Sequence, residues 1–504
     1  MVWSNTLSYL TTFNNIHHLD FLAGYEIDDT YNDYLSGEAY NFTTPDKHAI
    51  SNGMKTVSVG GSDSKYRLVS YLSRLNYDYK NKYYLGASFR VDGSSRLHRD
   101  NRWGTFWSVS GAWRTIEEEF MQPVKDWLTD LRIRASYGVN GTLPSDYFGY
   151  MGLSSISGGY LEQPGIQMSQ IANPNLKWET NYNMNIGLDF GFWDRLNFTI
   201  EYYTRTTKNL LMDCPVSMTT GFSSYLMNIG EVKNKGIELT INSTNIKIKD
   251  FNWNTTFNLG HNSNKVVKLD GEQTQIVSGT QIHKVGSSYR TFYVQEFAGI
   301  NPETGNPLFY TNELDENGNY IKEITENSKN AQFIPYKHAE PTVNGGISNS
   351  LRYKWLDLNF LFSYQFGGYS YDTWAQKTEH GGYDSYANIP TYYRDSWKKP
   401  GDQTNIEVYM PGKSSSVSMH KITSSRRIHS TDYFRLKNIT FGITLPKEWT
   451  NKINIGNVRF YASASNLWTW AAYDNYDPEA VSAGSATQTT PPLKTVTFGL
   501  NINF

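Results

Sequence analysis

The amino-acid sequence predicts an all-β fold, an antiparallel transmembrane β-barrel. Three observations support it: apolar and polar residues alternate in short segments along the whole chain, the connections between these segments alternate between short and long, and the chain stops within such a segment. Because successive side chains of a strand point to opposite sides, this alternation makes one face of each strand apolar and the other polar.

The terminal segment, residues 494–504, shows the pattern most clearly. Its polar residues and glycine fall on one face, and its length matches the roughly 9–11 residues of a membrane-spanning strand. We expect the apolar face to contact lipid, and a final strand of this kind would pair with the first strand to close a ring. The residues of the apolar face are Val496, Phe498, Leu500, Ile502 and Phe504.

Fifteen segments with the two-residue period are expected to form strands, and no 3.6-residue pattern of comparable length competes with them. One example is 130–138, where Leu131 and Ile133 alternate with Arg132 and Arg134. The expected ranges are 2–13, 18–25, 66–78, 83–91, 105–114, 130–138, 177–190, 195–207, 230–243, 251–262, 342–353, 356–367, 431–445, 456–466 and 494–504.

The connections between these strands alternate in length. The long ones are 26–65, 92–104, 139–176, 208–229, 263–341, 368–430 and 467–493. Short periplasmic turns and long extracellular loops are the plan of an outer-membrane barrel, whereas a β-sandwich has no such parity. Bacterial single-chain barrels have an even number of strands, so an odd count indicates either a miscount by one strand or an incomplete barrel.

Composition excludes several classes of protein. The mean hydropathy of −0.56 suits a soluble β-rich protein or a large barrel equally, and no stretch is long and apolar enough for a transmembrane helix. The first residues lack the pattern of a signal peptide. The single cysteine, Cys214, excludes an internal disulfide. A net charge of −2 without Lys/Arg runs gives no support for nucleic-acid binding.

Several motifs along the chain occur in the order of one family. They occupy 90–96, 101–104, 173–179, 228–238, 298–305, 433–438, 465–468, 476–479 and the terminal strand. Together they resemble the SusC/RagA group of TonB-dependent outer-membrane transporters of Bacteroidetes. Each motif also has a structural interpretation: Trp103, Trp107, Trp113, Trp178 and Trp468 suit the aromatic girdles of a barrel.

The resemblance implies the barrel portion of an outer-membrane nutrient importer that takes up an oligosaccharide or a peptide. It also implies energy from the TonB complex, a SusD-like surface lipoprotein as partner, and a barrel-assembly machinery that recognises the terminal strand. Residues 1–504 correspond to the C-terminal part of the barrel, while the plug, the TonB box and the N-terminal domain find no match. Barrels of this class have about 22 strands, so roughly seven are missing.

Two other functions remain open at this point: a passive porin-like outer-membrane channel and a soluble β-rich binding protein. An enzyme is not expected, because the sequence has no nucleophile elbow, no His-Glu-x-x-His zinc motif and no P-loop. No cofactor or metal is expected either. The segment 315–320 resembles a calcium loop, but the spacing favours a turn at Asn317–Gly318.

The long connection 368–430 is rich in aromatic residues. Aromatic faces stack on sugar rings and anchor protein interfaces, which makes these residues candidates for contact with substrate or partner. The alternative is that they pack the loop on itself. They are Tyr369, Tyr371, Trp374, Tyr383, Tyr386, Tyr392, Tyr393 and Trp397.

Overall fold

The computed structural model describes residues 1–504 with the exception of 43, 45, 47–48, 161–162, 270–273, 383–387, 412–421, 451, 453–454, 488 and 504. Within these residues the largest sheet has fifteen strands, which follow one another in chain order. They are β1 (Val2–Phe13), β2 (His17–Phe42), β3 (Gly53–Tyr79), β4 (Tyr83–Ser94), β5 (Trp103–Trp113), β6 (Leu128–Thr142), β9 (Glu179–Phe192), β10 (Leu196–Lys208), β13 (Glu231–Lys247), β14 (Phe251–Lys268), β22 (Val343–Tyr353), β23 (Leu356–Phe366), β26 (Tyr433–Thr444), β27 (Asn457–Ala471) and β30 (Thr495–Asn503).

The fifteen strands expected from the sequence are the strands of this sheet, so the all-β fold class is confirmed. Strands β1 and β30 stand at the two ends of the strand order, and within the described residues the sheet is not closed into a ring. This agrees with the expected incomplete barrel. No helix in the described part of the chain is long and apolar enough to cross a bilayer.

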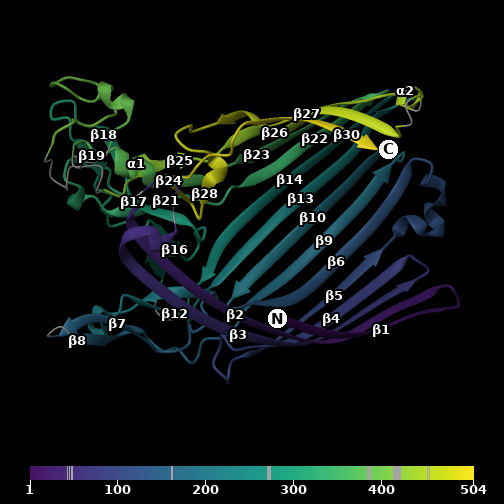
Figure 1. Ribbon diagram of the computed structural model, residues 1–504, viewed down its shortest axis with the longest axis horizontal. Coiled ribbons are helices and arrows are strands. Elements are labelled where there is room, and N and C mark those ends of the chain that lie inside the picture. The colour runs from purple at the N-terminus through teal and green to yellow at the C-terminus, as the bar shows by residue number, and fades with distance from the viewer. Residues whose placement is uncertain are drawn as a thin grey trace. The chain divides into compact units, whose positions relative to one another are not determined.

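The chain divides into two compact units. The first contains residues 1–115, 134–185 and 205–231. In it β1 to β5 run antiparallel to their neighbours, and the β1–β2 pairing extends from Val2 opposite Asp28 to Phe13 opposite His17 (Figure 1). Its connections form two smaller hairpins: β7 (Leu153–Tyr160) with β8 (Gln163–Gln170), and β11 (Leu211–Pro215) with β12 (Ser224–Asn228).

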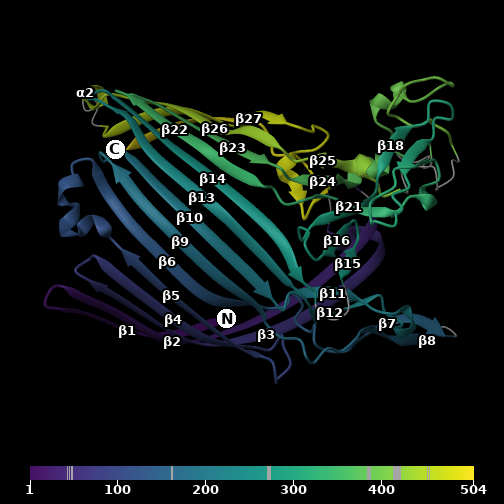
Figure 2. The ribbon, with the colours of Figure 1, turned by 180° about the vertical axis from the view of Figure 1, so that it is seen from behind.

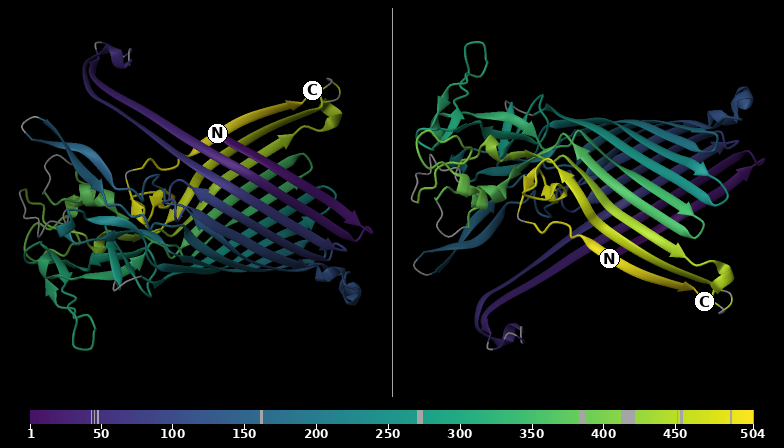
Figure 3. Two further views of the ribbon diagram at one scale, coloured as in Figure 1. Left: turned by 90° about the horizontal axis from the view of Figure 1, so that it is seen from below. Right: turned by 90° about the horizontal axis from the view of Figure 1, so that it is seen from above.

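The β2–β3 hairpin differs from the sequence-based expectation of a loop over 26–65. The two strands stay paired out to Phe42 opposite Gly53, far beyond the end of β4 at Ser94, which pairs with Leu68 (Figure 3). Residues 29–65 carry many Asp, Ser, Asn and Gly, which are poor strand formers and mask the alternation. Backbone pairing between the strands nevertheless satisfies their N–H and C=O groups.

The second unit contains residues 116–133, 186–204 and 232–504. Here β14, β22, β23, β26, β27 and β30 pair antiparallel in that order (Figure 2). Its connections fold into further short elements. They are β15 (Gln275–Ser278), β16 (Gln281–Lys284), β17 (Thr291–Gln295), β18 (Phe297–Ile300), β19 (Pro307–Tyr310), β20 (Ile324–Thr325), β21 (Phe333–His338), β24 (Tyr369–Asp372), α1 (Thr373–Thr378), β25 (Ile428–Ser430), α2 (Lys447–Thr450), β28 (Val481–Ser482) and β29 (Ser485–Ala486).

At Gly345 on β22, the neighbouring strands leave no space for a side chain. A Cβ there would collide with the backbone oxygen of Asn258 and with the hydroxyl of Tyr364. That hydroxyl donates a hydrogen bond to the Asn258 oxygen at 2.9 Å, so neither neighbour is free to move away. Because Gly345 has no side chain, the side chain of Tyr364 can lie across β22 and reach Asn258 on β14.

We predict that Gly345→Ala in the full-length protein lowers the fraction of folded, heat-modifiable barrel on gels. Overpacking of this kind costs about 1–3 kcal/mol. Gly111→Ala on β5 is the matched control, because the nearest atom to its new Cβ lies 3.7 Å away. An equal folded fraction for Gly345→Ala and Gly111→Ala would show that the close approach is not a constraint.

Candidate functional site

The described apolar residues of the terminal strand are exposed, and so are the Thr and Asn residues that alternate with them, so the expected lipid-facing side remains a prediction. Phe498 is 80% exposed, and Val496, Leu500 and Ile502 are also exposed. Opposite them on β27 stand Ala462, Ala464, Phe460 and Val458, so the apolar stripe continues across two strands. Phe504, the last residue of the expected stripe, lies outside the described residues.

The aromatic residues of the 368–430 loop separate into packed and exposed groups. Tyr383 and Tyr386 lie outside the described residues. Tyr371 and Tyr393 are buried, and Tyr371 packs with Phe292, Val294 and Ile428 in a small core. Tyr369, Tyr392 and Trp397 are half-buried. Of the six predicted aromatic residues that the structure describes, Trp374 alone belongs to the exposed class; Tyr409 of the same loop, which was not among the predicted residues, is exposed as well.

Hydrogen bonds fix two of the half-buried rings. The Tyr392 hydroxyl donates to the carboxylate of Glu379, and burial followed by that nearby charge raises the pKa of Tyr392. The indole N–H of Trp397 donates to the backbone oxygen of Pro302 at 2.7 Å. The Trp397 ring covers Gly305, where a Cβ would collide with it. These rings hold the loop together, which favours the packing interpretation for them.

A buried ion pair that the sequence did not indicate lies beside these rings. Arg427 has no exposed surface, and its Nη1 atom lies 3.2 Å from the Glu379 carboxylate. The Nε atom of Arg426 lies 3.7 Å from the same carboxylate. Buried charges need such partners, because an unpaired charge in a low-dielectric interior is strongly destabilising. The only sequence signal was the Arg426–Arg427 pair, which resembles any exposed basic dipeptide.

Three of the motifs shared with the family meet in one core of the first unit. Trp178 packs edge-on against Phe106 at a centroid distance of 5.2 Å and donates its indole N–H to the Arg102 oxygen at 2.9 Å. The Asn228 side chain bonds both the N–H and the C=O of Lys177, each at 2.9 Å. Trp178 is therefore buried in a core, which corrects its expected place in an aromatic girdle.

Two more motifs meet in the second unit. Arg435, only 2% exposed, forms ion pairs with Asp477 and Glu479. Lys437 reaches Glu479 at 2.7 Å, and the Tyr433 hydroxyl donates to Glu479 at 3.0 Å. The motif on β26 thus holds the motif at 476–479 against the strand.

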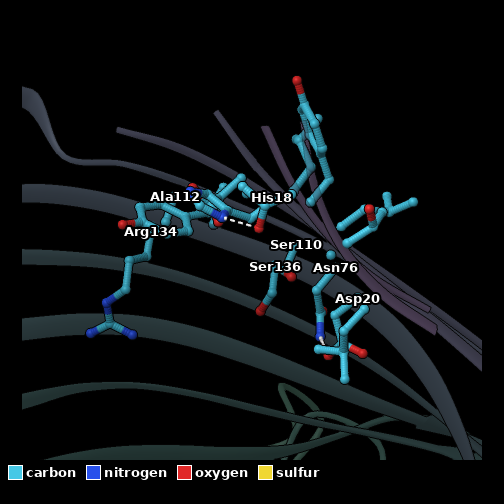
Figure 4. Close-up of a pocket in the computed structure, with 18 of the residues that line it drawn as sticks. His18, Asp20, Asn76, Ser110, Ala112, Arg134 and Ser136 are labelled. Atoms are coloured by element: carbon cyan, nitrogen blue, oxygen red, sulfur yellow. Dashed lines mark hydrogen bonds between the residues drawn. The ribbon is translucent and has the colours of Figure 1, made fainter. Parts of the chain in front are cut away.

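The polar face of the first unit forms a cavity of about 750 Å³ over β1 to β6 (Figure 4). His18, Asp20, Asn76 and Arg134 line it, and Asn76 donates to the Asp20 carboxylate at 3.3 Å. In the second unit, Trp374, Asp474 and Arg435 line a separate cavity of about 620 Å³. Both cavities carry polar and charged groups suited to hydrophilic ligands or protein segments.

The structure describes no group of three or more His, Cys, Asp or Glu residues placed to hold a metal ion. The segment that resembles a calcium loop forms a turn instead. The Asp315 carboxylate accepts hydrogen bonds from the N–H groups of Asn317 and Asn319, at 2.9 and 2.8 Å. Gly318 has a φ of +82°, and Leu314 pairs with Tyr320, so the predicted turn is confirmed.

Comparison with known proteins gives consistent matches. The family model described as "TonB dependent receptor-like, beta-barrel" matches residues 2–313. TonB-dependent receptor P3 of Formosa agariphila is 32% identical over 99% of this chain and 52% of its own length. TonB-dependent receptor SusC of Bacteroides thetaiotaomicron is 30% identical over 94% of this chain and 47% of its own length.

The solved structure of the RagAB peptide transporter superimposes with a TM-score of 0.87 at 27% identity. The match covers all of this chain and 55% of that one. The chain spans about half the length of the curated relatives it matches. These relatives are receptors and transporters rather than enzymes.

We predict that Arg435→Gln loosens the segment that follows β27. It leaves Asp477 and Glu479 without their strongest partner, and breaking a buried pair costs about 3–5 kcal/mol. Limited proteolysis of the full-length protein in intact cells should show new cleavage within 472–491. Lys322→Gln, which removes an exposed ion pair with Glu296, is the control and should leave the digestion pattern unchanged. Identical patterns for both variants would refute the anchoring role.

Proposed function

Because the chain belongs to the β-barrel family of TonB-dependent receptors, which are outer-membrane proteins, we propose that it supplies the barrel wall of a nutrient importer for oligosaccharides or peptides. The observation that carries this proposal is the fifteen-stranded sheet, in a chain that matches SusC over 94% and RagAB over all of its length. Residues 1–504 are then the C-terminal part of the barrel domain, with the plug, TonB box and N-terminal domain outside them.

The two faces of the strands support the proposal. The stripe on β30 and β27 leaves large apolar side chains uncovered, and lipid is the environment that removes their contact with water. In the first unit, the polar and charged side chains of His18, Asp20 and Arg134 line a cavity. Polar side chains of this kind suit the passage of a hydrophilic cargo.

We further propose that a SusD-like surface lipoprotein covers the long loops and that the TonB complex supplies the energy. The similarity to SusC supports both. The loop hairpins also carry apolar side chains in water-exposed positions: Ile156 and Ile166 on β7 and β8, and Met218 beside β11. Exposed apolar residues of this kind are typical of protein interfaces.

The proposed function predicts that the full-length protein fractionates with outer membranes and that its deletion abolishes growth on one class of oligosaccharide or peptide. A tagged copy should restore growth and co-purify a lipoprotein encoded nearby in near-equal amount. Growth restored by a copy that lacks the TonB box would instead identify a passive channel. Consistent absence of the lipoprotein, although it is expressed, would remove the proposed partner.

The terminal strand is proposed as the signal for barrel assembly, with Val496, Phe498, Leu500, Ile502 and Phe504 as the recognised face. Phe504→Lys places a charge near the membrane interface, where its cost to the folded state is only about 0–1 kcal/mol. We predict a large loss of outer-membrane protein on immunoblots, since recognition rather than stability is impaired. Asn503→Lys, on the polar face, is the control. Normal membrane levels of the Phe504 variant would count against this signal.

A further inference from the structure

The cavity of about 620 Å³ in the second unit has two aromatic walls. Trp374 comes from α1 and Trp470 from the end of β27, with 40% and 48% of their surface exposed. Trp374 is held in place because α1 is capped by Asp372, whose Oδ1 atom accepts the Ala375 N–H at 2.8 Å. The indole rings are thus available at a fixed site, and a tryptophan face attracts cations.

The charge of the lining is strongly one-sided. Asp372, Asp474 and Asp477 contribute three negative charges and Arg435 one positive charge, so the formal sum is −3 + 1 = −2. Arg435 is already committed to ion pairs with Asp477 and Glu479. An anionic ligand is therefore disfavoured in this cavity, and a cationic ligand is favoured.

The three carboxylates are not equivalent. The second oxygen of Asp372 accepts a hydrogen bond from the Tyr473 hydroxyl at 3.1 Å, and Asp477 is engaged by Arg435. Asp474 has no hydrogen-bond or ion-pair partner among the described residues, and it is exposed at the cavity. One carboxylate is thus free to meet a ligand, while the other two maintain the structure around it.

A neutral sugar can stack on the tryptophans and donate hydroxyl hydrogen bonds to Asp474, but it carries no positive charge to offset the net negative lining. A cationic group gains from both the indole faces and the Asp474 carboxylate. We propose that this cavity binds an alkylammonium or guanidinium group. The group can belong to a lysine or arginine side chain of a peptide or to the free amino group of an amino sugar. That the bound molecule is imported cargo rests on the function proposed above; binding itself does not.

Isothermal titration calorimetry on the purified full-length protein at low salt tests the proposal. The probes are the N-acetylated, C-amidated tripeptides Gly-Arg-Gly and Gly-citrulline-Gly, which differ only in the side-chain charge, and the glucosamine dimer with its N-acetylated counterpart. Within at least one pair, the cationic member should bind about tenfold more tightly, as expected for a combined cation–π and carboxylate contact. The pair that shows the difference identifies the source of the cation. Asp474→Asn should abolish the difference.

Two control variants distinguish an effect at the cavity from the general effect of removing a charge or altering an exposed tryptophan. Glu316→Gln removes an equally exposed charge elsewhere in the second unit, and Trp468→Phe alters an exposed tryptophan that does not line the cavity; both should preserve the preference. Trp374→Leu should weaken cation binding several-fold. Equal affinity within both pairs, or a preference that survives Asp474→Asn, would overturn the proposal. Binding with full preference but without uptake in cells would refute the import function and leave the site intact.

Discussion

The need to pair every backbone N–H and C=O group in a bilayer governs this structure. In hydrocarbon an unpaired group costs several kcal/mol, so a strand can span the membrane only with neighbours on both sides. The fifteen strands meet this need by antiparallel pairing in chain order, the arrangement that short turns allow most simply. Since β1 and β30 stand at the ends of that order, each has one edge that this sheet leaves without a neighbouring strand.

The motifs shared with the family mostly hold loops to strands. Asn228 satisfies the backbone of Lys177, which lies outside the strands, and Trp178 bonds the backbone oxygen of Arg102, which also accepts the N–H of Ser94. Arg435 holds Asp477 and Glu479 by charge. Holding a long loop in one conformation costs conformational entropy. Buried hydrogen bonds and ion pairs offset this cost, because they form in that one conformation.

Loops anchored in this way can present side chains at fixed positions. The packed rings of Tyr371, Tyr393 and Trp397 form the interior of the loop region, while Trp374 and Trp470 remain exposed at one cavity. The same residue type therefore serves packing in one place and stays available for a ligand in another. The exposed rings line the cavity to which Arg435 and Asp474 also belong, whereas the packed rings do not line it. This difference in position distinguishes the two roles.

The sequence by itself determined the number of strands, their order and the apolar face of the terminal strand, because side-chain direction alternates with every residue and needs no distant information. It missed the length of the β2–β3 hairpin, where polar residues hide the period. Only the tertiary structure decided that Trp178 is buried, that Arg427 pairs with Glu379, and that Asp474 stays free while Asp372 and Asp477 are engaged. These outcomes depend on contacts between residues up to about a hundred positions apart. The alternation of apolar and polar residues within one segment contains no information about such contacts.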